Sequence, residues 1–235
     1  MPGTLHVVAT PIGNLEDVTL RALRILGEVD AIACEDTRTT AKLLARHSIR
    51  TPLVALYGRS GASLLDRLKA GDSIALVSES GTPGVSDPGA DLVSSAHEAG
   101  VAVRVVPGPC AAAAAASASG LPVDRFLFEG FLPKKPGKRR RLLESLAREP
   151  RTLLFYESPH RVAATLEALR DALGDRKITI ARELTKVFEE IRPTTLSAAI
   201  ADLAKRPPRG EYVLVVAGAA KVKGSRRARA GGEEE

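Results

Sequence analysis

Aromatic residues and cysteines are scarce in this chain of 235 residues. It has no tryptophan and only three tyrosines, so base stacking on a broad aromatic platform is not expected. Two cysteines, Cys34 and Cys110, are too few for a disulfide framework and lack the spacing of a zinc site. We therefore expect a cytoplasmic protein without a structural metal.

Long hydrophobic runs are also missing. No apolar run reaches the roughly 18 residues that a membrane span needs, and the N-terminal MPGTLHVVATPIG lacks the basic region that opens a signal peptide. Apolar residues nevertheless make up 44% of the chain, which predicts a sizeable core and argues against global disorder. The length fits one large domain or two modest ones.

Positive charge is clustered rather than spread along the chain, whose formal net charge is +6. Such a cluster favours polyanions, and charge alone supports nucleic acid about as well as a solvated loop. The segment after Ala220 has neither periodicity nor apolar content, so we expect residues 221–235 to be a disordered tail. The internal cluster holds six cations in eight residues: Lys134, Lys135, Lys138, Arg139, Arg140 and Arg141.

Strand-like and helix-like patterns alternate along the chain, which predicts an α/β fold with a mostly parallel sheet and helices on both faces. A break at Gly120-Leu121-Pro122 predicts two α/β domains, residues 1–119 and 120–220. Ser158 and Pro159 are typical of a helix N-cap and first turn. We expect strands at 6–9, 31–33, 53–56, 74–77, 101–106, 126–128, 152–156, 178–181 and 212–216, and helices at 19–26, 39–46, 63–69, 91–99, 110–119, 138–147, 160–173 and 196–204.

The most informative segment is SESGTPGVSDPG, from Ser78 to Gly89, which follows a buried strand. Three glycines and two prolines in twelve residues exclude a simple turn, and such a loop exposes backbone N–H groups to a closely approaching ligand. It holds two acids, Glu79 and Asp87, but no lysine or arginine. The loop therefore suits a ligand with positive charge or ribose hydroxyls better than a phosphate.

Three more unusual loops follow strand ends, at residues 10–17, 34–38 and 107–110. In open α/β sheets, ligands bind outside the carboxyl ends of the strands, so these loops predict a site at one sheet edge. Dinucleotide, P-loop, serine-hydrolase and zinc-protease motifs do not occur. The four histidines lie in different elements without the spacing of paired metal ligands.

Six motifs occur in order across nearly the whole chain: VATPIGNLEDVTLRAL, EDTRTTAKLL, SESGTPGVSDPG, VPGPCA, FYESPHR and ARELTK. Together they closely resemble the ribosomal RNA small subunit methyltransferase I family, which has the tetrapyrrole-methylase fold of class III S-adenosylmethionine-dependent methyltransferases. The resemblance implies two α/β domains with S-adenosylmethionine in the cleft between them, and a homodimer. It also implies methylation of the ribose 2′-hydroxyl of a decoding-centre cytidine in 16S rRNA.

Carried over by motif, the resemblance implies a set of cofactor-binding residues. They come from both domains, and the small alanine run after Cys110 would leave room for the cofactor. The set is Pro11, Gly13, Asn14, Glu79, Ser80, Gly81, Thr82, Pro109, Cys110, Ala111, Tyr156, Glu157 and Leu184, with Glu183 beside it.

Methyl transfer to a weakly acidic ribose hydroxyl calls for a base or a nearby cation. Asp36, Glu183 and Lys186 are the candidate catalytic residues; Lys186 can act as a base only with a depressed pKa, from burial beside Arg182. Candidate RNA contacts are Arg38, Arg161 and the Lys134–Arg141 cluster.

Two alternatives remain open. One is a methylase of the same fold that acts on a precorrin or uroporphyrinogen-type tetrapyrrole, whose acidic groups would also attract cations. The other is a non-catalytic RNA-binding assembly factor that keeps the fold. S-adenosylmethionine binding separates the second alternative from both enzymes.

Overall fold

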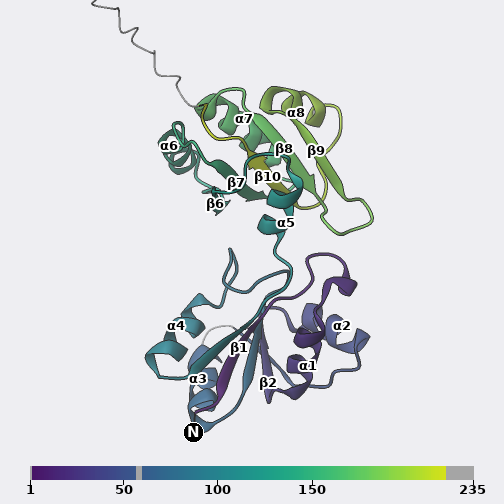
Figure 1. Cartoon of the computed structure of the whole chain (residues 1–235), viewed down its shortest axis with the longest axis vertical. Coiled ribbons are helices and arrows are strands. Elements are labelled where there is room, and N and C mark those ends of the chain that lie inside the picture. Colours follow the sequence, from purple (N-terminus) through teal and green to yellow (C-terminus); the bar gives the residue numbers. More distant parts are fainter. Residues whose placement is uncertain (1, 57–59, 221–235) are drawn as a thin grey trace, which may run out of the picture.

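The computed structural model describes residues 2–56 and 60–220, which form two lobes stacked along the long axis (Figure 1). The N-terminal lobe contains β1 (Thr4–Val8), η1 (Leu15–Asp17), α1 (Leu20–Glu28), β2 (Ala31–Cys34), α2 (Thr37–Arg46), β3 (Leu53–Ala55), α3 (Ser60–Ala70), β4 (Ile74–Val77), α4 (Ala90–Glu98) and β5 (Ala102–Val106). The C-terminal lobe contains α5 (Ala111–Ala118), β6 (Phe126–Phe131), α6 (Pro136–Ser145), β7 (Thr152–Glu157), α7 (Val162–Leu173), β8 (Lys177–Arg182), β9 (Glu190–Thr195), α8 (Leu196–Leu203) and β10 (Tyr212–Val216).

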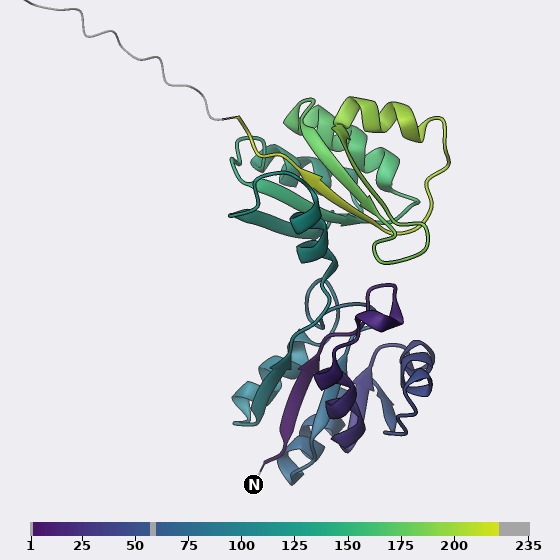
Figure 2. The same ribbon diagram turned by 45° about the vertical axis from the view of Figure 1, so that its right-hand side comes forward.

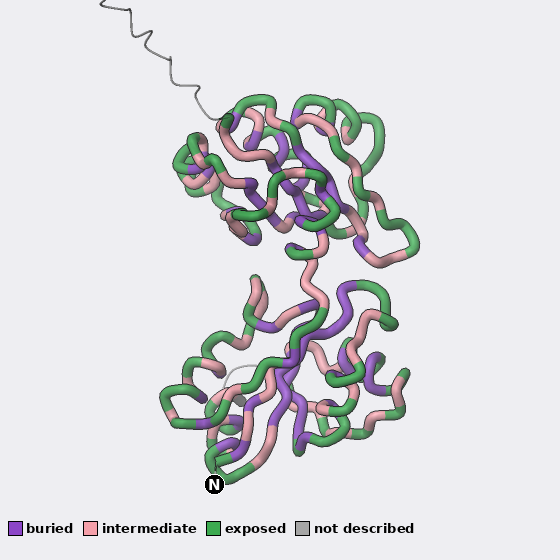
Figure 3. The backbone as a smooth tube through the Cα atoms, viewed as in Figure 1, coloured by how far each residue is buried: buried purple, intermediate pink, exposed green. Residues whose placement is uncertain are grey.

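The sheet of the N-terminal lobe is parallel throughout, with the order β3-β2-β4-β1-β5. Helices α1 and α2 pack on one face through Leu26 and Leu43, and α3 and α4 pack on the other through Leu64 and Leu92. Strand β4 is buried along its whole length, because both faces are covered. Strand β2 is buried along its whole length as well, and buried segments run through the middle of the lobe (Figure 3). The predicted parallel sheet with helices on both faces is confirmed for this lobe.

The sheet of the C-terminal lobe is mixed, with the order β6-β7-β10-β8-β9. Only β6 and β7 run parallel; β10 is antiparallel to β7 and β8, and β9 is antiparallel to β8. The prediction of a mostly parallel sheet is therefore wrong for this half. Strand β9 was not predicted, because Pro193 and the charged Glu190 and Arg192 hide its pattern. An edge strand tolerates such residues.

The alanine-rich helix α5 packs on the second sheet, on the side that faces the N-terminal lobe (Figure 2). Ala112, Ala115 and Ala116 are buried against Leu154 of β7 and Val213 of β10. Small side chains let the helix backbone approach the strands closely. The packing favours a division between the lobes before α5, about ten residues earlier than the predicted boundary after Ser119.

Helix α7 begins later than predicted and has a different N-cap. Arg161 occupies the N-cap position, and the carbonyl of Ser158 accepts hydrogen bonds from the N–H groups of Arg161 and Val162, at 3.1 and 3.0 Å. The prediction of Ser158 as the N-cap is therefore wrong. Instead, the Ser158-Pro159-His160 segment forms a turn between β7 and the helix, and this turn borders the site described below.

Within residues 2–56 and 60–220, no helix combines the length and the apolar character that crossing a bilayer requires. The same residues contain no group of three or more His, Cys, Asp and Glu side chains arranged to hold a metal ion. The tail predicted to be disordered, residues 221–235, lies outside the described residues.

Candidate functional site

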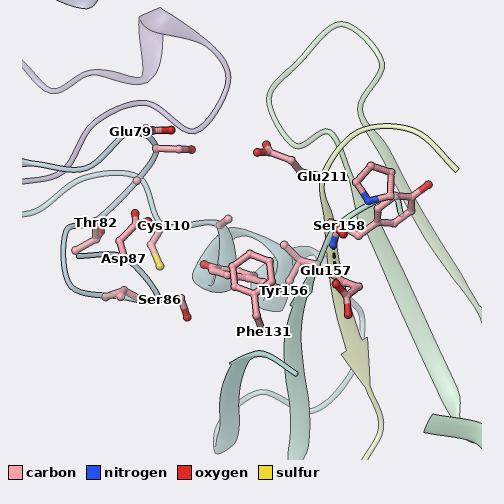
Figure 4. Close-up of a pocket in the computed structure, with 17 residues that line it drawn as sticks. Glu79, Thr82, Ser86, Asp87, Cys110, Phe131, Tyr156, Glu157, Ser158 and Glu211 are labelled. Carbon is pink, nitrogen blue, oxygen red and sulfur yellow. Dashed lines mark hydrogen bonds between the residues drawn. The ribbon is translucent and has the colours of Figure 1, made fainter. Parts of the chain in front are cut away.

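A cavity of about 410 Å³ lies at the junction of the two lobes. Its walls come from the 78–89 loop of the N-terminal lobe, the start of α5, the ends of β6 and β7, and the beginning of β10 (Figure 4). The lining residues are Glu79, Ser80, Gly81, Thr82, Val85, Ser86, Asp87, Cys110, Ala111, Phe131, Tyr156, Glu157, Ser158, Pro159, Glu211, Tyr212 and Val213.

Hydrogen bonds to neighbouring segments hold the 78–89 loop in place. Gly81 forms an isolated bridge with Thr10, with N···O distances of 2.8 and 3.2 Å, and the Thr82 hydroxyl donates to the Pro109 carbonyl at 3.1 Å. The sequence predicts bare N–H groups in this loop, but at Gly81 that is wrong because its N–H donates to Thr10. Gly81 has φ +85°, a conformation that glycine adopts without strain.

The loop also touches the other lobe. A Cβ added to Gly130 of β6 would lie 2.4 Å from the Ser86 hydroxyl oxygen. Both residues have positive φ, 61° and 59°. Only a glycine in β6 permits this approach, so Gly130 helps to define the mouth of the cavity.

Acidic side chains dominate the charge of the cavity, since its described lining contains no lysine or arginine. Glu211 points across the cavity towards Glu79, and Asp87 lies near Cys110 (Figure 4). Burial raises the pKa of Asp87, and the nearby charges of Glu35 and Glu79 raise it further. Such a cavity favours a ligand that carries positive charge.

Tyr156 fastens the start of α5 to β7. Its hydroxyl oxygen accepts a hydrogen bond from the Ala112 N–H at 3.0 Å, which satisfies one of the free donors of the first helical turn. Burial, together with the neighbouring Cys110 thiol, raises the pKa of Tyr156, so the hydroxyl stays protonated at neutral pH. The phenol ring forms part of the cavity wall.

Glu157 borders the cavity, but its carboxylate does not face the ligand space. The side chain is fully buried; it accepts hydrogen bonds from the Thr165 hydroxyl at 2.7 Å and from the Ser158 N–H at 2.9 Å. Arg161 lies 3.4 Å away and also donates to the Leu132 carbonyl at 2.6 Å. These contacts tie the end of β7 to α7, so they indicate a structural role for this carboxylate.

Five of the predicted cofactor residues do not line this cavity. Pro109 and Leu184 support its walls through the contact with Thr82 and through the apolar cluster around α5. Pro11 lines a small cavity of about 60 Å³, and Glu79 lines it too. Gly13 and Asn14 line a separate cavity of about 580 Å³ together with Lys186.

The sequence missed the lining residues at the start of β10, and the reason is topological. We expected functional groups only after strand ends, which is correct for parallel strands. Because β10 is antiparallel to β7, its first residue, Tyr212, pairs with Glu157 at the end of β7. Glu211 and Tyr212 therefore reach the same edge from the opposite direction. The lining residues outside the predicted cofactor set are Val85, Ser86 and Asp87 of the predicted 78–89 loop, and Phe131, Ser158, Pro159, Glu211, Tyr212 and Val213.

None of the three candidate catalytic residues lines the 410 Å³ cavity. Asp36 caps α2 and pairs with Arg38 at 2.9 Å, and hydrogen bonds from Arg38 lower its pKa to about 2. So weakly basic a carboxylate is poorly suited to remove a proton from a hydroxyl.

Glu183 and Lys186 connect to the cavity through Glu211. The Lys186 ammonium contacts Glu183 at 2.9 Å and Glu211 at 2.8 Å. Burial lowers the pKa of Lys186, but its hydrogen bonds to these two carboxylates outweigh burial and raise the pKa above its ordinary value. The depressed pKa that Lys186 would need to act as a base is therefore not found, and Arg182 pairs with Glu190, at 3.1 Å.

The candidate RNA contacts differ in exposure. Arg38 is highly exposed, with 88% of its side chain accessible. The Arg161 side chain is only 24% exposed, because it pairs with Glu157 and donates a hydrogen bond to the Leu132 carbonyl. The Lys134–Arg141 cluster lies before and along α6, where every member except the half-buried Arg139 is exposed. In the chain the cluster begins three residues after Phe131, which lines the cavity.

The chain is similar to proteins of a known family over most of its length. A model of the family described as Tetrapyrrole (Corrin/Porphyrin) Methylases matches residues 4–200. The chain is 51% identical over 222 residues to the Ribosomal RNA small subunit methyltransferase I of Synechocystis sp., covering 92% of this chain and 80% of that protein. It is 51% identical over 226 residues to the protein of the same name from Xylella fastidiosa, covering 93% and 83%. The crystal structure of uroporphyrin-III-C-methyltransferase from Thermus thermophilus is similar with a TM-score of 0.65 and 21% identity, over 91% of this chain and 94% of that one.

Proposed function

Because the chain belongs to the tetrapyrrole methylase family, and within it to the ribosomal RNA small subunit methyltransferases I, we propose that it methylates 16S rRNA with S-adenosylmethionine. The acceptor in this proposal is the ribose 2′-hydroxyl of a decoding-centre cytidine. The observation that carries the cofactor assignment is an acid-lined cavity between the lobes without lysine or arginine in its described lining. An enzyme with an RNA substrate of this kind would act in the cytoplasm, and we propose that it works as a homodimer.

The residues that border the cavity fit the cofactor. S-adenosylmethionine would supply an electrophilic methyl group on a cationic sulfonium. Asp87 and Glu79 offer carboxylates to positive charge and ribose hydroxyls, and Thr82 and Ser80 add hydroxyl groups. Ala111 and Cys110 at the start of α5 leave a small, weakly polar wall. Five further residues lie outside the cavity lining and would help only by fixing the loops that form its walls. They are Pro11, Gly13, Asn14, Pro109 and Leu184.

Alignment of the acceptor oxygen is the main task of the protein in methyl transfer. We propose that the Glu211 carboxylate, at the cavity, accepts the proton of the ribose hydroxyl. Lys186 orients this carboxylate through the 2.8 Å contact, and Glu183 holds Lys186 in turn. Glu183 and Lys186 therefore remain in the proposal as positioning residues, and Asp36 as a residue that orients Arg38 towards RNA.

Two measurements test the proposed function. Calorimetric titration is expected to show S-adenosylmethionine binding at one site per chain, and the absence of binding would refute both methylase assignments. Mass mapping of 16S rRNA from a strain that lacks the gene is expected to show a decoding-centre cytidine without its ribose methyl. An unchanged ribose methyl in that strain would refute the RNA target.

A tetrapyrrole substrate is the second candidate, supported by the family description and not by the likeness to uroporphyrin-III-C-methyltransferase. At 21% identity that likeness concerns the fold alone. Incubation with uroporphyrinogen III and labelled S-adenosylmethionine separates the two substrates. Label in the tetrapyrrole rather than in ribosomal subunits would favour this candidate.

Asp87→Asn is expected to weaken S-adenosylmethionine binding at neutral pH roughly tenfold, because a hydrogen-bonded charge is lost. The raised pKa of Asp87 also fixes a pH dependence. Its carboxylate is protonated at a higher pH than an ordinary aspartate, so the affinity for a cation falls as the pH drops through this raised pKa. Calorimetry between about pH 4 and pH 7 is expected to show this decline in the wild type and a flatter profile in the variant.

The exposed Asp91 of α4 provides a matched control, since it lies outside the 410 Å³ cavity. Asp91→Asn is expected to leave both the affinity and its pH profile unchanged. Equal effects of the two substitutions would show that general surface charge, and not the cavity carboxylate, attracts the cofactor.

A further inference from the structure

Strand β6 places two phenylalanines on the same side of the second sheet although they are three residues apart. In a regular strand, residues separated by three point to opposite faces. Here Phe128 pairs with Leu154 and Gly130 with Phe155, so Glu129 is an extra residue that forms a bulge. The bulge returns Phe131 to the face of Phe128.

Both phenylalanine rings pack edge-on against Tyr156 in the wall of the cavity. The ring centroids are 4.8 Å apart for Phe128 and Tyr156, with an angle of 68° between the rings, and 5.6 Å and 65° for Phe131 and Tyr156. Phe131 lines the cavity but remains 53% exposed. Tyr156 thus supports one edge of an aromatic ring that is open to solvent at the cavity mouth (Figure 4).

The position of Phe131 is fixed on both sides along the chain. Before it, Gly130 is held against Ser86 of the other lobe at positive φ. After it, the Leu132 carbonyl accepts a 2.6 Å hydrogen bond from Arg161, whose guanidinium is paired with buried Glu157. A preorganised, half-exposed aromatic ring loses little conformational freedom when a flat partner covers it.

Positive charge follows directly on this ring. Lys134 and Lys135 are exposed three and four residues after Phe131, and the exposed Arg140 and Arg141 continue along α6. An exposed aromatic ring with cations close to it in the chain, here Lys134 and Lys135, is a combination that single-stranded nucleic acid binds, with phosphates on the cations and a base on the ring. Helix α6 itself packs on the opposite face of the sheet from Tyr156.

We propose that Phe131 is the stacking platform for the nucleobase of the nucleotide that is methylated, while Lys134 and Lys135 contact the phosphates on its flank. This assignment rests on the proposed function and adds the subsite for the RNA base. A base on the open face of Phe131 would bring its attached ribose to the mouth of the cavity. One ring serves here in place of the broad aromatic platform that the composition excludes.

Kinetics on ribosomal small subunits that lack the methyl group test this subsite. Phe131→Leu removes the aromatic face with little change in size, and we expect kcat/KM for the subunit to fall at least tenfold, the effect of about 1.4 kcal/mol. Phe131→Trp keeps a flat aromatic ring, so its kcat/KM is expected to stay within about threefold of the wild-type value. The dissociation constant for S-adenosylmethionine is expected to change less than about twofold in both variants.

Phe126 provides the matched control, because it is a 40% exposed phenylalanine of the same strand that does not line the cavity. Phe126→Leu is expected to keep the wild-type kcat/KM. The natural chain has no tryptophan, so Phe131→Trp also introduces a single fluorescent reporter. Its emission is expected to be quenched by a short oligoribonucleotide that contains the target cytidine, and not by S-adenosylmethionine.

Several results would overturn the assignment. Wild-type kcat/KM in Phe131→Leu would remove the stacking role, and so would an equal loss in Phe126→Leu. A parallel loss of S-adenosylmethionine affinity would assign the ring to the adenine of the cofactor instead. If the wild type itself transfers no methyl group to the subunit, the proposed function fails together with this subsite.

Discussion

Replacing Glu157 by leucine is expected to lower the free energy of unfolding by about 3 kcal/mol. The carboxylate is fully buried and accepts hydrogen bonds from Thr165 and Ser158, with Arg161 at 3.4 Å. Leucine would leave the Thr165 hydroxyl and the Ser158 N–H without their acceptor and would remove the charge that pairs with Arg161, which would keep only its hydrogen bond to the Leu132 carbonyl. Urea denaturation monitored by circular dichroism measures the loss.

Glu157→Gln separates the structural role from a role in cofactor binding. The amide oxygen can still accept one of the hydrogen bonds, so the expected loss of stability is about 1 kcal/mol. Because the carboxylate faces Thr165 and not the cavity, S-adenosylmethionine affinity is expected to change less than about twofold. Glu144→Gln, in an exposed pair with Arg140 on α6, is the control and is expected to leave stability unchanged.

A contrary result would restore the interpretation from the sequence, which assigned Glu157 to the cofactor. That result would be a large loss of S-adenosylmethionine affinity in Glu157→Gln at unchanged stability. The carboxylate would then have to turn into the cavity when the ligand binds.

Gly13→Val is expected to reduce S-adenosylmethionine affinity at least tenfold and kcat/KM roughly a hundredfold, since misplacement by about 1 Å can cost that much. A Cβ at Gly13 would lie 2.6 Å from Cγ of Lys186 and 2.8 Å from both the Leu184 carbonyl oxygen and the Thr185 hydroxyl oxygen. The backbone of the 183–189 loop must therefore move, and Lys186 with it.

The valine of Gly13→Val would crowd the contact between the lobes and not the core of either lobe. This overpacking is therefore expected to lower the free energy of unfolding by only about 1–3 kcal/mol. Calorimetry, steady-state kinetics and urea denaturation on the same preparation separate the two effects. Gly27→Ala is the control: it lies inside α1 with nothing within 4 Å of an added Cβ. It is expected to stabilise the protein by about 0.5–1 kcal/mol at unchanged activity. Wild-type affinity in folded Gly13→Val would refute the role of this contact.

The elements of the N-terminal lobe follow closely from sequence patterns. Residues 74–77 were predicted as a buried strand and form β4 over the same residues. Thr19, which opened the predicted helix at 19–26, caps α1 through a 3.1 Å hydrogen bond to the Ala22 N–H. Such features depend on residues that are neighbours in the chain, so the local sequence specifies them.

The second lobe shows where local patterns stop being sufficient. Strands that are buried on one or both faces look alike whether they run parallel or antiparallel, so the direction of β10 was not evident. That direction brings Glu211 to the cavity. The bulge at Glu129 was not evident either, because the predicted strand ends at Phe128, and without the bulge Phe131 would face the other side of the sheet.

The sequence by itself determined the family, the alternation of strands and helices, and the 78–89 loop as an acid-bearing wall for a cationic ligand. Motif spacing and local propensity suffice for these, because each involves a short stretch of chain. Only the tertiary structure decided that the Gly81 N–H donates to Thr10, that the Glu157 carboxylate turns away from the cavity, and that Lys186 pairs with Glu211. Each of these three features is a contact of a polar group with a residue from another segment of the chain. The packing within and between the two lobes decides which residues meet, so the local sequence does not specify these contacts.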